Sequence, residues 1–93
     1  VSFEVNATTV FGQNIFVVGN RPELGAWNTN NAIAMSAATY PIWKATVTLP
    51  FNTAVEYKYI RKEGGTVTWE SGFNRTFSTA TVCNLTRSDT WRP

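Results

Sequence analysis

The sequence predicts an all-β fold: an antiparallel β-sandwich or open-sided β-barrel, immunoglobulin-like, with about seven to eight strands. Apolar and polar residues alternate through most of the chain, and helical periodicity is absent. Turn-forming residues recur about every 8–12 residues, a spacing typical of sandwiches and small barrels. The 93 residues are 14% aromatic and 15% charged, which suits one packed domain (residues 1–93) with a thin core.

The first half of the chain contains four predicted strands. Residues 1–5 alternate from the first residue, and residues 14–19 are apolar on both faces, as in a central strand. Glycine, proline and asparagine make segment 20–31 a loop. A short strand is expected at 33–35. In 42–49 the odd-numbered positions form an apolar stripe that ends at a proline.

The second half contains a hairpin and two further strands. Residues 55–60 alternate, 63–65 supply a turn, and 66–71 return as the partner strand. A β-branched run at 76–82 and the segment 89–91 complete the predicted fold.

The register of this hairpin predicts a charge pair. If 63–65 form the whole loop, Lys58 lies opposite Glu70, and cross-strand neighbours of opposite charge attract. Trp69 then lies beside the pair. A slip of one residue would turn every side chain to the other face.

Two tryptophans are expected at the surface. Trp27 lies in segment 19–28, which is too polar and too broken by turn residues to belong to a core. Trp69 is followed by Glu70 and, shortly after, by Asn74. The C–H face of a pyranose stacks on a flat ring, while its hydroxyls need donors and acceptors. Glycan binding is therefore the leading hypothesis.

The other aromatic residues have simpler interpretations. Tyr57 and Tyr59 read as core residues with their hydroxyls at the rim. Trp91 reads as an anchor for the last strand. Trp43 begins an apolar stripe and fits a core position or a binding position equally well. Lys58, taken alone, would be an ordinary solvated lysine.

Five segments, in this order and near the usual spacing, resemble a known family. They are Gly12–Gly19, Leu24–Trp27, Trp43–Pro50, Glu56–Arg61, and Trp69–Ser71 with Asn74-Arg75. They resemble the starch-binding domains of the family-20 carbohydrate-binding modules, over essentially the whole chain. Such domains are typically C-terminal modules of fungal glucoamylases and other secreted starch-degrading enzymes.

The resemblance implies an open barrel or sandwich with two non-catalytic glucan sites. At the first site, it implies that Trp27 and Trp69 stack on successive glucose rings. It also implies that Lys58, Glu70 and Asn74 hydrogen-bond the hydroxyls. The second site would involve Phe11, Tyr40 and Trp43, and we expect it to be the weaker.

Three features of the chain lead to that expectation for the second site. Ala38 stands where the family often has an aspartate, Phe11 keeps a ring without a hydroxyl, and the loop between Tyr40 and Trp43 is short.

The expected function is non-catalytic binding of starch and other α-1,4-glucans, including amylose, maltooligosaccharides and cyclodextrin. The module would be a monomer, covalently linked to a secreted catalytic domain. Selectivity would come from two rings set at an angle that matches the helical curve of amylose.

Several observations concern secretion. Asn6, Asn74 and Asn84 lie in glycosylation sequons, which are compatible with secretion. A glycan on Asn74 would block the first site, so we expect none there. Cys83 is either a free thiol or the partner of a cysteine upstream of Val1. No signal-peptide pattern and no membrane-spanning run is visible, and the alternation begins in mid-pattern at Val1, so we expect an excised module or a mature C-terminal fragment.

Other function classes find little support. The chain has no histidine and one cysteine, so no Ser-His or Cys-His pair and no zinc or copper cluster is expected. No two of the six acidic residues are obviously brought together for glycoside hydrolysis, so we expect no enzymatic activity and no cofactor. A net charge of +2 makes nucleic acid a weak candidate.

Two competing readings use the same exposed aromatics. A module for single-stranded nucleic acid would bind with steep salt dependence. An immunoglobulin-like protein-interaction domain would show an apolar patch and no response to maltooligosaccharide.

Overall fold

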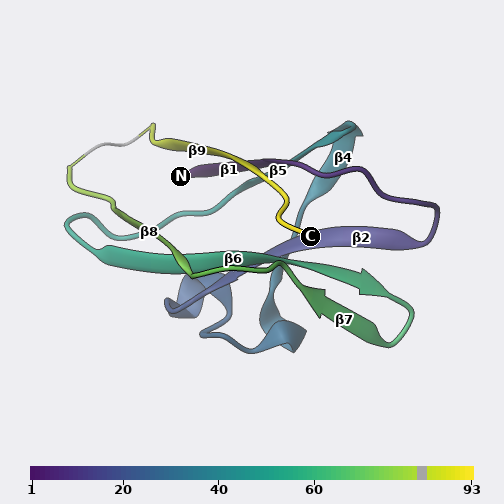
Figure 1. Cartoon of the computed structure of the whole chain (residues 1–93). Helices are drawn as coiled ribbons and strands as arrows, with labels where there is room; N and C mark the ends of the chain where they lie inside the picture. Colours follow the sequence, from purple (N-terminus) through teal and green to yellow (C-terminus); the bar gives the residue numbers. More distant parts are fainter. Residues whose placement is uncertain (82–83) are drawn as a thin grey trace.

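Two β-sheets face each other in the computed structural model, which describes residues 1–81 and 84–93 (Figure 1). The first sheet has four strands in the order β4-β5-β1-β9. Its strands are β1 (Ser2–Asn6), β4 (Ser36–Thr39), β5 (Ile42–Thr46) and β9 (Thr86–Thr90). All neighbours are antiparallel except β1 and β9, which run parallel.

The second sheet has five strands and is antiparallel throughout. Its order is β3-β2-β6-β7, and β8 also pairs with β6. The strands are β2 (Gln13–Gly19), β3 (Ile33–Ala34), β6 (Ala54–Glu63), β7 (Thr66–Trp69) and β8 (Arg75–Ser78). Strand β6 is the longest. Its residues from Tyr57 to Glu63 pair with the whole of β2.

The predicted sandwich is confirmed, with differences in single elements. The short strand expected at 33–35 divides: β3 pairs with β2 in one sheet, whereas β4 pairs with β5 in the other. Met35, between them, is buried. This division adds β4, which was not predicted, and brings the described strands to nine. The strand expected at 76–82 ends at Ser78, and its last residue lies outside the described residues, as does Cys83.

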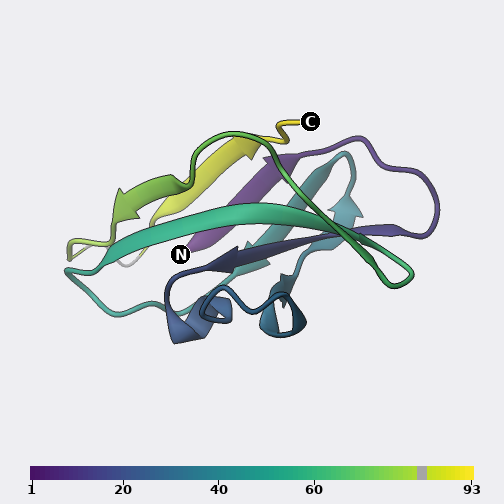
Figure 2. The same cartoon turned by 60° about the horizontal axis from the view of Figure 1, so that its bottom comes forward.

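The predicted loop at 20–31 contains two short 3-10 turns, η1 (Pro22–Leu24) and η2 (Thr29–Asn31). This segment lies beside β2 (Figure 2): Leu24 of η1 is buried in the core between the sheets, whereas the part around Thr29 lies at the outer face of the five-stranded sheet. Lys62 reaches it from β6, where its ammonium donates to the carbonyl of Thr29 at 2.7 Å. Val18 and Ile60 lie on this outer face and are fully buried.

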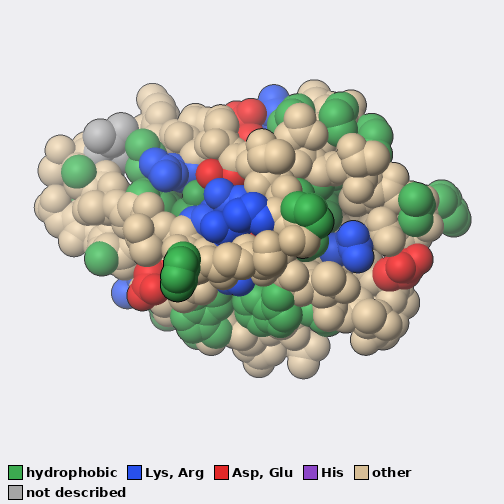
Figure 3. Space-filling view, in the orientation of Figure 1, with side chains coloured by type: hydrophobic (Ala, Val, Ile, Leu, Met, Phe, Trp, Pro, Cys, Tyr) green, Lys and Arg blue, Asp and Glu red, His purple; other side chains and the backbone are tan. Residues whose placement is uncertain are grey.

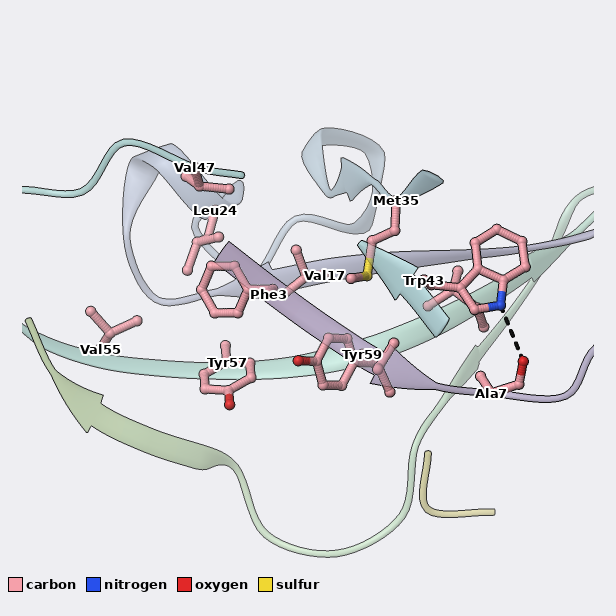
Figure 4. Close-up of a cluster of buried hydrophobic side chains, with 12 residues drawn as sticks. Phe3, Ala7, Val17, Leu24, Met35, Trp43, Val47, Val55, Tyr57 and Tyr59 are labelled. Carbon is pink, nitrogen blue, oxygen red and sulfur yellow. Dashed lines mark hydrogen bonds between the residues drawn. The ribbon is translucent and has the colours of Figure 1, made fainter. Parts of the chain in front are cut away.

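The core lies between the two sheets (Figure 4). Aromatic rings fill its centre: Phe3 packs edge-on against Tyr57 at 5.0 Å between ring centroids, and Phe77 closes the group. Tyr57 and Tyr59 are fully buried, as predicted. Trp91 is partly buried against the core, and its backbone N–H donates to the carbonyl of Asn6, as expected of a strand anchor.

Trp43 is a core residue. Its side chain is 4% exposed, and its indole N–H donates to the carbonyl of Ala7 at 3.1 Å (Figure 4). The hydrogen bond satisfies the polar edge of a ring that is otherwise surrounded by apolar side chains. Of the two roles that the sequence left open for Trp43, the core role is the one observed.

Replacing Trp43 with alanine should therefore destabilise the fold. We expect Trp43→Ala to lower the free energy of unfolding by about 3–5 kcal/mol, because it leaves a cavity and an unpaired carbonyl. Trp43→Phe, which keeps most of the ring, should cost less. Urea unfolding measures both. Equal stability of Trp43→Ala and the unmodified chain would contradict the core assignment.

Candidate carbohydrate-binding surface

Trp27 and Trp69 lie side by side. Their ring centroids are 6.2 Å apart and their planes are inclined by 43°. Trp69 ends β7 and is 42% exposed, while Trp27 follows η1 and is partly exposed. The two indoles singled out in the sequence therefore share one surface. Figure 3 shows apolar side chains gathered at the surface beneath β6, where the helical turns lie.

The backbone around Trp27 is unusual. Gly25 ends η1 in the left-handed region, with φ 83°, and a Cβ there would lie 2.6 Å from the carbonyl oxygen of Asn31. Ala26 and Trp27 then also adopt positive φ, of 49° and 63°. Non-glycine residues in this region cost on the order of 1–2 kcal/mol each. The backbone N–H of Trp27 donates to the carbonyl of Gly19 at 2.8 Å, which fixes the turn to the end of β2.

The register of the β6–β7 hairpin differs by one residue from the predicted one. The turn is only two residues long, with Gly64 at φ 57°, so Ile60 lies opposite Trp69. The expected pairing of Lys58 with Glu70 is therefore wrong. In the observed register Trp69 shares the outer face with Lys58 and Ile60, and Glu70 turns to the inner face.

Glu70 is consequently a buried acid and not an exposed one. Its carboxylate is 1% exposed and accepts two hydrogen bonds from the guanidinium of Arg75, both at 2.9 Å. It also accepts from the N–H of Tyr59 at 3.1 Å, and Arg92 lies 3.4 Å away. A carboxylate with these partners fixes the end of β7. The sequence predicted an exposed carboxylate at Glu70, and the structure shows a buried one.

The Glu70–Arg75 pair extends into a network that the sequence did not reveal. Arg75 also binds Asp89 at 3.2 Å, and Asp89 accepts from the hydroxyls of Tyr57 and Tyr59 at 2.6 and 2.7 Å. Burial, together with the hydrogen bond to Asp89, raises the pKa of Tyr57 to about 12. The same causes, burial first, raise the pKa of Tyr59 further. Three strands are joined by this network.

Lys58 and Asn74 remain on the outer side. The Lys58 ammonium donates to the carbonyl of Gly72 at 2.9 Å, and the Asn74 amide donates to the carboxylate of Glu56 at 3.3 Å. Glu56 is exposed and was missed as a candidate. The signal was present in the alternation of β6, which places Glu56 on the same face as Lys58. Glu56 provides the exposed carboxylate that Glu70 does not.

The residues predicted for a second site lie at one end of the sandwich. Phe11 is fully exposed and Tyr40 is 48% exposed, beside a shallow hollow of about 480 Å³. The Tyr40 hydroxyl donates to the carbonyl of Thr9 and accepts from its N–H. Buried Trp43 packs edge-on against Tyr40, with 6.4 Å between centroids. Trp43 thus supports the ring of Tyr40 from the side of the core.

Two further features concern metal ligands and membrane-spanning helices. Residues 1–81 and 84–93 contain no group of three or more His, Cys, Asp or Glu side chains that could hold a metal ion. None of the helical segments there is long and apolar enough to cross a membrane.

Residues 1–89 match the family described as the starch binding domain. The chain belongs to this family. It is 52% identical to glucoamylase-1 of Schizophyllum commune, covering 99% of this chain and 16% of that protein. It is 56% identical to an alpha-amylase of Streptomyces violaceus, covering 98% of the chain and again 16% of the relative. The chain thus spans about one sixth of the length of these relatives.

Solved structures agree with this assignment. A glucoamylase from Hypocrea jecorina superposes with a TM-score of 0.94 at 39% identity, over 99% of this chain and 17% of that one. The family 20 module of the maltotetraose-forming amylase from Pseudomonas saccharophila gives a TM-score of 0.83 at 27% identity, with 97% of both chains covered. The chain is therefore a non-catalytic starch-binding domain, and neither competing reading is favoured.

The buried position of Glu70 generates a prediction about stability. Glu70→Gln removes one of the two carboxylates that pair with Arg75 and leaves Asp89 alone, and breaking a buried pair from one side costs about 3–5 kcal/mol. We expect a loss of this size in urea unfolding. The matched change Glu56→Gln, at an exposed carboxylate, should alter stability by less than about 0.5 kcal/mol. A fully stable Glu70→Gln variant with impaired glucan binding would instead indicate a direct ligand contact.

The raised pKa of Tyr57 predicts alkaline unfolding. An unfolded tyrosine ionises near pH 10, whereas folded Tyr57 ionises at about pH 12, so the folded state holds its proton more tightly. The stabilisation is complete below about pH 10 and is lost as the pH rises towards 12. Urea unfolding at about pH 8 and about pH 11 should show the decline, and Tyr57→Phe should weaken it. A free energy of unfolding that stays the same at both pH values would contradict the raised pKa of Tyr57.

Proposed function

We propose that residues 1–93 act as one module that holds an attached secreted amylolytic enzyme on granular starch. Trp27 and Trp69 stack on neighbouring glucose units, and Lys58 and Asn74 hydrogen-bond their hydroxyls. The observation that carries the proposal is the pair of partly exposed indoles, 6.2 Å apart and inclined by 43°. Few other arrangements of side chains offer two flat apolar faces to successive rings of one chain.

The inclination of the rings supports selectivity for α-glucans. An α-1,4-linked chain curves, so successive glucose rings tilt relative to one another. Two indoles inclined by 43° match such a curve better than the flat ribbon of cellulose, which suits coplanar rings. The constrained backbone at Trp27 keeps this angle, because the turn is bonded to Gly19 and shaped by Gly25. A ring held in place loses little entropy on binding.

The polar groups around the indoles support hydroxyl recognition. An ammonium carries three N–H donors, and the hydrogen bond of Lys58 to Gly72 uses one of them. Asn74 and Glu56 are hydrogen-bonded to each other, so that an amide and a carboxylate lie together beside Lys58. We assign Glu70 a positioning role: it holds Arg75 and the strand end from which Trp69 projects.

We expect weak individual sites. Stacking on an aromatic ring contributes roughly 1–3 kcal/mol for nucleobases, and sugars should lie at the low end. With a few solvent-competed hydrogen bonds, dissociation constants on the order of micromolar to millimolar follow. Such sites still retain an enzyme on a repeating surface, because attachment keeps the local ligand concentration high.

We further propose that Phe11 and Tyr40 form a second, weaker glucan site. Both rings are exposed beside one hollow, and Trp43 and Thr9 hold Tyr40 in place. Trp43 itself is buried and does not stack on ligand. The hollow also exposes Asn14, whose amide can serve hydroxyls.

The partners follow from the same proposal. Starch, amylose, maltooligosaccharides and cyclodextrin share the curved α-1,4 chain that the inclined rings suit. The matched relatives include a glucoamylase, an alpha-amylase and cyclomaltodextrin glucanotransferases, and each is about six to eight times longer than this chain. We propose that this module likewise accompanies a starch-active catalytic domain, is secreted with it and acts as a monomer.

Calorimetric titration with a cyclodextrin tests the proposal. We expect Trp69→Ala to weaken binding by at least about tenfold, since one of two stacking faces is lost, and Trp69→Phe to retain part of the affinity. Because the ligand is neutral, raising the salt concentration should leave binding nearly unchanged. Undiminished binding by a Trp27→Ala, Trp69→Ala double variant would place the glucan elsewhere. Steep salt dependence would favour nucleic acid.

A further inference from the structure

Phe73 is an exposed ring for which neither the fold nor the proposed site has a use. It lies in the connection between β7 and β8, and its side chain is 91% exposed. A single exposed apolar residue needs no explanation by itself. Phe73 differs because of the way in which its backbone is held.

The chain on both sides of Phe73 is fixed by hydrogen bonds. The carbonyl of Gly72 accepts from Lys58 at 2.9 Å, and the carbonyl of Phe73 accepts from Arg92 at 2.6 Å. The Asn74 amide donates to Glu56. An anchored backbone presents the ring in one place and lowers the entropy lost when a ligand stacks on it.

Gly72 gives the connection its direction. It adopts φ 86°, and a Cβ there would lie 3.0 Å from the guanidinium of Arg92. The glycine thus lets the chain turn closely over Arg92, whose own backbone carbonyl accepts from the N–H of Ser71 at 2.9 Å. The turn allows Asn74 to return to β6 with Phe73 facing solvent.

The same hydrogen bonds place Phe73 along the proposed site. Trp69 lies opposite Ile60, Gly72 bonds to Lys58, and Asn74 bonds to Glu56. The connection therefore follows β6 from its middle toward its beginning. Trp69 lies at the level of Ile60 and Arg75 at the level of Tyr57, so Phe73 falls within a stretch of roughly 10 Å along the strand that begins at Trp69.

Trp27 is anchored at the far end of this stretch of β6. Its N–H bonds to the carbonyl of Gly19, and Gly19 lies opposite Tyr57, the residue between Glu56 and Lys58. Trp27 is thus tied to one edge of β6 through β2, whereas the connection that carries Phe73 follows the other edge of β6 from β7 to β8.

We propose that Phe73 is a third stacking residue, which extends the first site to an α-glucan chain longer than the two indoles can cover. This inference rests on the proposed function of that site. A ligand that spans only the two indoles does not reach Phe73. A longer chain that continues past Lys58 and Asn74 places a further glucose unit over the phenyl ring.

Titration with maltooligosaccharides of different length tests the assignment. Phe73→Ala should bind maltotriose like the unmodified module but bind maltoheptaose about 3- to 10-fold more weakly. Phe73→Trp, with a larger ring, should bind maltoheptaose at least as well as the unmodified module. Phe51→Ala is the matched control, because Phe51 is also exposed (54%) but lines a different hollow with Val1 and Leu49. It should leave both affinities unchanged, and thermal unfolding checks that each variant is folded.

The outcomes separate this inference from the proposed function. If the unmodified module binds neither oligosaccharide, the proposed function fails. If it binds both and Phe73→Ala binds both equally well, the proposed function stands and the role of Phe73 is refuted. Equal weakening for maltotriose and maltoheptaose also refutes it, because Phe73 would then act within the two-indole site and not beyond it.

Discussion

The buried ion pair between Glu70 and Arg75 is the interaction on which the binding surface depends. Glu70 follows Trp69 directly, so the position of its carboxylate sets the position of the indole. Its oxygens take hydrogen bonds from Arg75 and from the backbone of Tyr59, and Arg75 continues to Asp89 on β9. A buried charge pair adds little net stability, but separating its partners is costly, so the pair holds the end of β7 in place. That property is the one a stacking surface requires.

The hairpin turn decides which groups belong to this network and which to the surface. With two residues in the turn, Trp69 faces outward beside Lys58, and Glu70 faces the tyrosine hydroxyls. A three-residue turn, as the sequence led us to expect, would exchange these faces. Glu63, Gly64 and Gly65 fit both turns, and composition does not distinguish them. The choice comes from the sheet, because only the observed register brings Glu70 to Arg75 across four intervening residues.

The sequence predicted residues whose role follows from local pattern and missed those whose role follows from tertiary pairing. Trp27 was predicted at the surface because its own segment cannot form a core, and alternation predicted Tyr57 as buried. The burial of Glu70 could not be predicted, since its partners come from other strands. Glu56 was missed although alternation places it on the same face as Lys58, because only the hydrogen bond from Asn74, in another segment, connects it with the site.

The division between buried ions and exposed rings also accounts for the kind of ligand that the surface suits. The acid next to Trp69 is neutralised inside the protein, and Lys58 and Glu56, on the outer face of β6, have opposite signs and lie two residues apart. At the proposed site a neutral, hydroxyl-rich chain would gain from the rings, and hydrogen bonds to Lys58 and Asn74 would mainly set its orientation. Retention on an insoluble substrate then comes from the repetition of the ligand and not from the strength of any one contact.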